Sequence, residues 1–146
     1  MKNLLFTFFT FISLNTVAQN NIHSQEYFEG TINGNIEISF YLKIQEDGCP
    51  RVYADAIYRY KKNGENEWIL LKSTFSETKQ HYTFVEFFNT GVLLLKKEKN
   101  SLNGIWISPD GKKQFDVKLN KVQIDKESIE KLENELEKEI YEAHDC

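Results

Sequence analysis

The stretch that constrains the fold most lies between Leu102 and Leu119 and has the pattern of a β-hairpin. On both sides of a Pro109-Asp110-Gly111 turn, side chains alternate with a period of two, which places successive residues on opposite faces of a strand. Proline presets the φ angle that the turn needs, and glycine accepts a positive φ. The segment therefore predicts two antiparallel strands joined by a tight turn, with Trp106 in the core.

Looser copies of this hairpin recur along most of the chain. The clearest strand has five apolar residues at alternate positions between Ile36 and Ile44, directly after the turn signal Asn33-Gly34. About eight strands follow one another at a spacing of roughly 8–12 residues. We therefore expect residues 26–122 to form a mainly β domain, an antiparallel up-and-down meander of about eight strands that closes into a barrel. A half-open or sandwiched sheet is the alternative.

The periodicity changes after Lys121. Apolar residues then recur at intervals of three and four, which is the spacing of one helical face. They are Ile129, Leu132, Leu136, Ile140 and Ala143. Asp125 is placed to cap the N-terminus of this helix. The sequence predicts one C-terminal amphipathic α-helix over residues 124–144, packed against the barrel wall or across one open end.

The N-terminus has the three parts of a secretory signal peptide. A basic start, Met1-Lys2-Asn3, precedes an apolar run of 11 residues and a small-residue cleavage pattern that ends at Ala18. A membrane anchor is the alternative, but this run is shorter than the roughly 20 residues that span a bilayer. We expect a signal peptide over residues 1–18, secretion or export to the periplasm, no stable membrane insertion after cleavage, and a flexible segment over residues 19–25.

Charge is distributed unevenly along the chain. Nine acidic residues and three lysines lie between Asp125 and Cys146, whereas residues 19–124 carry 13 acidic and 14 basic side chains. A near-neutral body with an acidic tail lacks the basic footprint of a protein that binds nucleic acid. The two cysteines, Cys49 and Cys146, are candidates for a disulfide within the chain, and free thiols or a bridge between chains are the alternatives.

The sequence contains no recognisable catalytic motif. The histidines His23, His81 and His144 do not have the ligand spacing of a zinc site. No serine lies in the Gly-x-Ser-x-Gly turn of a hydrolase, and no glycine-rich phosphate loop precedes a helix. The sequence therefore predicts no catalytic residues, no metal site and no cofactor, and it favours a protein that is not an enzyme.

Glu86 is the most distinctive candidate for a binding site. It lies on a strand expected over residues 80–88, on the same inward face as Tyr82, Phe84 and Phe88. A carboxylate inside a barrel must be paired, hydrogen-bonded or protonated. One interpretation is a polar anchor for a small apolar ligand, in a site formed by Glu86, Tyr58, Tyr60, Tyr82 and Trp106. The alternatives for Glu86 are a hydrogen-bonded glutamate at the barrel mouth and a strand whose other face points inward. For the aromatic residues the alternative is simple packing, because eight strands enclose little more than their own side chains.

A second candidate site lies on the outer faces of two neighbouring strands. Four residues are expected to point outward there: Tyr41, Tyr53, Ile57 and Arg59. Aromatic residues and arginine are enriched at the centres of protein interfaces. This surface is therefore a candidate contact with a partner protein, and scattered apolar residues of an ordinary surface are the alternative.

The sequence around Gly104-Ile105-Trp106 and Gly30-Thr31-Ile32 resembles the antiparallel meanders of avidins and lipocalins, the calycin-like barrels. The lipocalin Gly-x-Trp lies on the first strand and this one on the seventh, so no ligand residues carry over. Residues 27–119 also resemble small uncharacterised secreted bacterial β-barrel proteins, which share the pattern Gly-x-Trp-x-x-Pro-Asp-Gly-Lys, here Gly104 to Lys112. This resemblance implies export and a barrel, and it implies no activity.

Three functions are consistent with these features. The first is a non-enzymatic secreted module that binds an unknown partner protein. The second is a carrier of a small apolar ligand in the barrel interior, as the calycin-like resemblance implies. The third is an inhibitor of a cell-wall hydrolase such as lysozyme, because an acidic surface attracts a basic enzyme.

Overall fold

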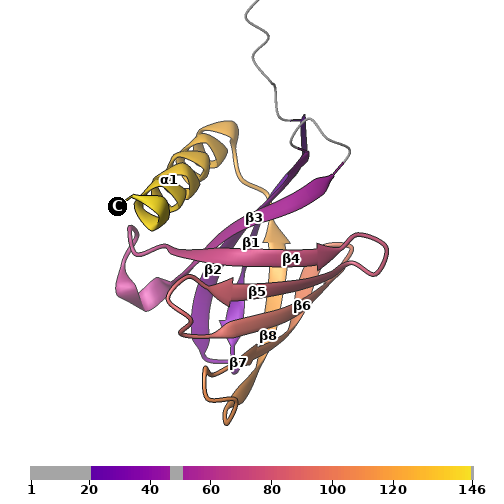
Figure 1. Ribbon diagram of the computed structural model, residues 1–146, viewed down its shortest axis with the longest axis vertical. Helices are drawn as coiled ribbons and strands as arrows, with labels where there is room; N and C mark the ends of the chain where they lie inside the picture. The colour runs from indigo at the N-terminus through magenta and orange to yellow at the C-terminus, as the bar shows by residue number, and fades with distance from the viewer. Residues whose placement is uncertain (1–20, 47–50, 146) are drawn as a thin grey trace, which may run out of the picture.

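Eight antiparallel strands close into a barrel in the computed structural model, which describes residues 21–46 and 51–145 (Figure 1). Each strand pairs with the next along the chain, and the last pairs with the first. The strands are β1 (Asn21–Ile32), β2 (Ile36–Glu46), β3 (Val52–Tyr60), β4 (Ile69–Ser76), β5 (His81–Glu86), β6 (Val92–Glu98), β7 (Ser101–Ile107) and β8 (Gln114–Val122). One helix, α1 (Lys126–His144), follows them, so the expected closed meander with a C-terminal helix is confirmed.

Two other expectations lie outside the described residues. They are the signal peptide over residues 1–18 and the disulfide, since neither Cys49 nor Cys146 is described. Between β3 and β4 the chain forms a short 3₁₀ turn, η1 (Lys61–Asn63). The turn between β1 and β2 follows its sequence signal: Asn33 and Gly34 have φ angles of 55° and 71°. Positive φ at both central residues is what a type I′ hairpin turn requires.

Two strand ends differ from the sequence-based expectation. β1 begins at Asn21, so residues 21–25, expected to be flexible, instead pair with the end of β2. This extension gives the backbone groups at the end of β2 a partner, and the Gln25 side-chain amide donates to Tyr41 Oη at 3.1 Å. β5 ends early, at Glu86, because Asn89 N donates to Glu86 O at 2.7 Å and turns the chain. As a result Phe88, expected on an inward face, is 81% exposed.

Aromatic and aliphatic side chains fill the barrel interior. Phe40, Tyr58 and Phe84 are fully buried, and the rings of Phe40 and Phe84 meet edge to face at 5.2 Å. Tyr82 stacks on both Phe75 and Phe84, with ring centres 5.2 and 5.7 Å apart. Burying a large apolar side chain contributes roughly 1.5–3 kcal/mol. This interior is therefore the main core of the protein.

The helix α1 packs on the outer wall of the barrel and encloses a second core. Leu132 and Leu136 are buried against the outward side chains of β2, β3 and β4, among them Tyr41, Ile57 and Leu70. The Asp125 side chain caps the helix by accepting from Ser128 N at 2.8 Å, as the sequence predicted. The helix lies over the junction of β3 and β4, which pair through only three residues of each strand. α1 therefore covers the shortest strand pairing in the described barrel.

Candidate functional site

Glu86 lies inside one end of the barrel and connects three strands. It is 3% exposed. Its Oε1 accepts hydrogen bonds from Tyr58 Oη at 2.6 Å and from Trp106 Nε1 at 2.8 Å, and its Oε2 accepts one from Thr90 Oγ1. The donors come from β3, β7 and the turn after β5. Both carboxylate oxygens are thus hydrogen-bonded by the chain itself, which satisfies a polar group that would otherwise be costly to bury.

Tyr60 extends this network by one hydrogen bond. Tyr58 Oη is 2.9 Å from Tyr60 Oη as well as in contact with Glu86. A phenol has one proton, and the carboxylate is the stronger acceptor, so Tyr58 donates to Glu86 and accepts from Tyr60. Burial raises the pKa of Tyr58 far above its usual value, and the nearby Tyr60 and Glu86 raise it further. Tyr58 therefore stays protonated and keeps donating at physiological pH.

Gly91 provides the space in which this network fits. A Cβ atom at this position would lie 2.3 Å from Trp106 Nε1 and 2.4 Å from Glu86 Oε1, well inside contact distance. The structure therefore brings together four of the five residues that the sequence grouped, namely Glu86, Tyr58, Tyr60 and Trp106. Their arrangement matches the alternative interpretation, a hydrogen-bonded glutamate among packed side chains, and a ligand role for them stays a prediction.

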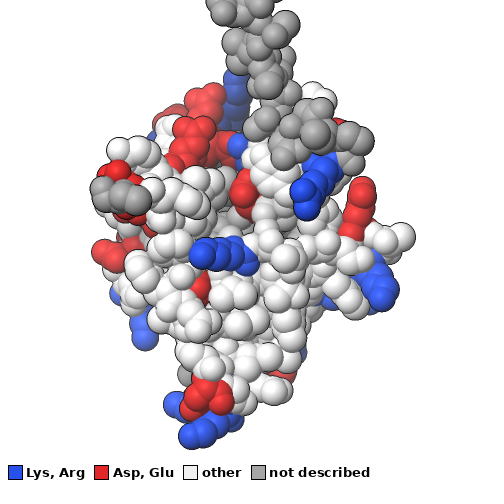
Figure 2. Space-filling view, viewed as in Figure 1, with Lys and Arg blue, Asp and Glu red and all other residues white. Residues whose placement is uncertain are grey.

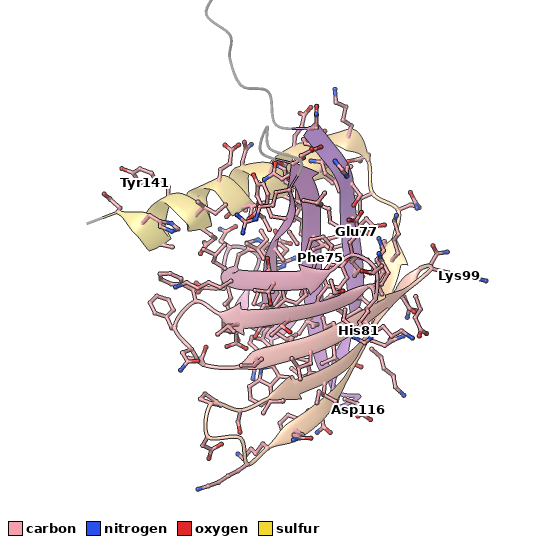
Figure 3. The ribbon with its side chains drawn as sticks, turned by 45° about the vertical axis from the view of Figure 1, so that its right-hand side comes forward. Phe75, Glu77, His81, Lys99, Asp116 and Tyr141 are labelled. Carbon is pink, nitrogen blue, oxygen red and sulfur yellow. The ribbon has the colours of Figure 1, made fainter. Side chains whose placement is uncertain are left out.

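Tyr82, the fifth residue of that group, is not part of the network. It lies near the opposite end of β5, where the chain turns from β4; Figure 3 shows Phe75, Glu77 and His81 at this end. Its hydroxyl is buried and has no hydrogen-bond partner among the described residues. Burial raises the pKa of Tyr82 to about 12, with smaller contributions from Glu26 and Glu77.

The same end of the barrel contains a cluster of three charges, in which two partly exposed lysines surround one buried carboxylate. Glu26 is 6% exposed and accepts from Lys121 Nζ at 2.6 Å and from Lys97 Nζ. Burial raises the pKa of Glu26, but the hydrogen bonds and charges of Lys121 and Lys97 outweigh it and leave the pKa below its usual value. The cluster links β1, β6 and β8, and its contacts are those of a structural ion pair.

The predicted outer contact surface is in fact covered by α1. Tyr41 and Ile57 are both 0% exposed, so the expectation that they are available to a partner protein is wrong. Tyr41 Oη donates to Glu133 of the helix, and the Lys43 ammonium pairs with the same carboxylate. The apolar stripe of α1 packs against this outer face of β2 and β3, which is why the face is buried. Tyr53 is half-buried on β3 and interacts with other residues of the chain.

Arg59 is the member of this predicted surface that lies beside the helix instead of beneath it. Its guanidinium stacks over the Trp68 ring at 5.0 Å, and its Nη1 donates to Gly64 O at 3.0 Å. Arg59 and Trp68 line a surface hollow of about 420 Å³ between the loop before β4 and the first half of α1. We call this the Arg59 hollow; its walls include Asn66, Leu132 and Glu135.

A second hollow lies on the other side of Trp68, along the last turns of α1. We call it the Phe88 hollow: it has a volume of about 240 Å³, and Trp68, Leu70, Phe87, Phe88, Glu139 and Glu142 line it. This site could not be recognised in the sequence, because its residues come from four separate places: the loop before β4, β4 itself, the turn after β5 and the helix. The available signal was the unbroken apolar run of residues 68–71, which gives β4 an outward apolar face in addition to its inward one.

Electrostatically, the Phe88 hollow is acidic. Burial raises the pKa of Glu139, and the charges of Glu142, Glu135 and Glu67 raise it further, against the opposing charge of Lys138. Acidic side chains also gather over α1 in the upper left of Figure 2. On the barrel side, Lys72 Nζ lies 4.9 Å from the ring centre of Phe87. The aromatic wall of the hollow thus already contacts one cation.

Within residues 21–46 and 51–145, no group of three or more His, Cys, Asp or Glu side chains is placed to hold a metal ion. No helix in this part of the chain is long and apolar enough to cross a membrane. No protein-family model, curated protein or solved structure matches the chain. The resemblance to calycin-like and small secreted bacterial barrels therefore stays a prediction from the sequence pattern.

Proposed function

We propose that this protein is an exported, non-enzymatic binding module that contacts a basic protein through the Phe88 hollow and the acidic surface of α1. The observation that carries this proposal is the position of Phe88, which is 81% exposed beside Glu139 and Glu142. An aromatic ring held in water next to carboxylates gains contact area and charge compensation when a basic side chain binds.

The chemistry of the hollow favours a lysine or arginine side chain of the partner. Trp68 and Phe88 offer aromatic surface, over which a cation is stabilised by roughly 0.5–2 kcal/mol. Glu139 and Glu142 offer acceptors for the same cation, whose positive charge also offsets the repulsion between the carboxylates. The nine acidic residues after residue 124 attract a basic protein over a longer range.

The barrel interior supports a carrier function less well. Its aromatic rings stack on one another, and the Glu86 carboxylate is occupied by Tyr58, Trp106 and Thr90. A ligand there would have to displace packed side chains, whereas a partner at the Phe88 hollow needs no rearrangement of the core. Among basic partners, a cell-wall hydrolase such as lysozyme is the first candidate, because exported proteins meet such enzymes.

Phe88→Ser tests this proposal with Leu94→Ser as its matched control. Leu94 is 39% exposed on β6, outside the Phe88 hollow, so both variants remove an exposed apolar side chain. In calorimetric titrations, we expect the wild-type protein to bind a basic lysozyme. Phe88→Ser should lower the affinity at least about tenfold, a typical hot-spot loss, whereas Leu94→Ser should leave the affinity unchanged. Unchanged affinity in Phe88→Ser would remove the hollow from the contact, and no binding at micromolar concentration would remove lysozyme as the partner.

A further inference from the structure

Arg59 is held rigidly but has no acidic partner. Among the described residues, no carboxylate lies within ion-pair distance of its guanidinium. Glu29, on β1 two strands away, pairs with Lys61 at 3.0 Å, and the charge of Arg59 makes only the smallest of the contributions that lower the pKa of Glu29. The Trp68 ring and the Gly64 carbonyl hold the side chain in place. Arginine presents five N–H donors in a fixed plane that suits a carboxylate, and Arg59 uses one of them in a hydrogen bond.

Two buried polar atoms on opposite walls of the Arg59 hollow have no hydrogen-bond partner in the described chain. One is a donor, Arg59 Nε, and the other is an acceptor, Glu135 Oε2, which forms an ion pair with Lys138 Nζ at 3.6 Å but accepts no hydrogen bond. Buried polar atoms in native proteins are nearly always hydrogen-bonded, so a donor and an acceptor that both lack a hydrogen bond beside one hollow indicate that a ligand completes them.

The charges and shape of the hollow define what fits between these groups. Arg59 and Lys131 on its walls are balanced by Glu65 and Glu135, so the lining favours a dipolar ligand over a polyanion. Trp68 and Leu132 supply apolar surface. The volume of about 420 Å³ lies within the range of roughly 300–1,000 Å³ that is typical of small-ligand sites.

We propose that the Arg59 hollow binds an α-carboxylate that stands next to an N–H donor, with the carboxylate on Arg59, the donor toward Glu135, and an apolar side chain against Trp68 and Leu132. A free apolar amino acid and the C-terminus of a peptide both present this chemistry. The site is separate from that of the proposed basic partner, because it lies on the other side of Trp68 and binds a carboxylate through Arg59.

The composition of the chain allows a direct test by NMR. The sequence has two arginines, Arg51 and Arg59, and two tryptophans, Trp68 and Trp106. The protein therefore gives two arginine Nε–H signals and two indole N–H signals, and each pair contains its own control. The probes are N-acetyl-Gly-Leu with a free carboxylate, the same dipeptide as its C-terminal amide, and free leucine, each titrated into the protein.

The free-carboxylate dipeptide is expected to shift the signals of Arg59 and Trp68 and to leave those of Arg51 and Trp106 in place. The amide is expected to bind at least about tenfold more weakly, because it lacks the charge that pairs with the guanidinium. Arg59→Gln should abolish this preference, and Arg51→Gln should keep it. If free leucine shifts the same signals more strongly than the dipeptide, the ligand is an amino acid; if more weakly, it is a peptide C-terminus.

Two results would overturn this assignment. One is the absence of any Arg59 shift at millimolar concentrations of both carboxylate probes, and the other is equal binding of the acid and the amide. Both comparisons use the unaltered protein, so they decide the question even if Arg59→Gln fails to fold. Neither depends on whether the Phe88 hollow binds a basic protein.

Discussion

Replacing Glu86 by alanine tests whether one buried carboxylate holds three strands of the barrel together. The substitution removes the acceptor for Tyr58, Trp106 and Thr90. Tyr58 can turn its proton toward Tyr60 Oη, 2.9 Å away. Trp106 Nε1 has no such replacement in the network, so it becomes a half-buried donor without an acceptor in the chain.

The expected loss of stability follows from these contacts. A buried donor left unpaired costs roughly 1–3 kcal/mol, and a hydrogen bond to a charged group contributes roughly 1.5–3 kcal/mol. We expect Glu86→Ala to lower the free energy of unfolding by about 3 kcal/mol, which corresponds to a Tm lower by about 10 °C in a domain of this size. Glu86→Gln keeps an acceptor for Trp106, and we expect it to lose only about 1 kcal/mol.

Urea unfolding followed by circular dichroism measures these differences, with Glu98→Ala as the control. Glu98 is exposed on β6, where it contacts Lys96, and its removal should leave the unfolding midpoint unchanged. A loss below about 0.5 kcal/mol in Glu86→Ala, the size of an ordinary surface effect, would refute the structural role of this network.

Three further predictions concern α1. Leu136→Ala empties a position that is 2% exposed and should lower the free energy of unfolding by roughly 2–4 kcal/mol; an unchanged Tm would contradict the docking of the helix. Burial raises the pKa of Glu133, but hydrogen bonds from Lys43 and Tyr41 outweigh it and leave the pKa below the ordinary 4.5. The stabilisation that ionised Glu133 contributes is therefore present above pH 4.5 and is lost as the pH falls through the lower folded-state pKa. Urea unfolding at a series of pH values should show that the free energy of unfolding falls more steeply with acidification in the wild type than in Glu133→Gln. Glu139→Gln removes a carboxylate whose charge is destabilised by burial and by repulsion from neighbouring glutamates. The substitution should raise the Tm slightly and weaken partner binding; a lower Tm would contradict this.

The barrel could be predicted from the sequence because its signals are local. β2 illustrates this: alternate apolar residues fix which face lines the barrel interior, and a register slip of one residue would turn that entire face outward. The turn at Asn33 and Gly34 is equally local. The grouping of Tyr58 with Glu86 in one candidate site also followed, since both residues lie on inward faces near the same barrel end.

The position of α1 could not be predicted in the same way. Its apolar stripe identifies the face that becomes buried, but several outer surfaces of a barrel can accept such a stripe. The sequence pattern therefore indicates a partner protein at Tyr41 and Ile57, where the structure places the helix. The two hollows depend on that position, because each combines helix residues with Trp68. The hydrogen bond of Trp106 to Glu86 likewise spans the barrel interior and depends on how the sheet closes.

In the function proposed above, the carboxylates beside the Phe88 hollow bind a basic protein. The sharpest test compares two double variants that remove the same charge from the same helix: Glu139→Gln with Glu142→Gln inside the hollow, and Glu130→Gln with Glu137→Gln outside it. In calorimetric titrations with a basic lysozyme at low salt, we predict that the first pair lowers affinity at least about tenfold and the second less than about threefold. Equal losses in the two double variants would mean that the helix acts only through its net charge, and this would contradict a specific site at the Phe88 hollow.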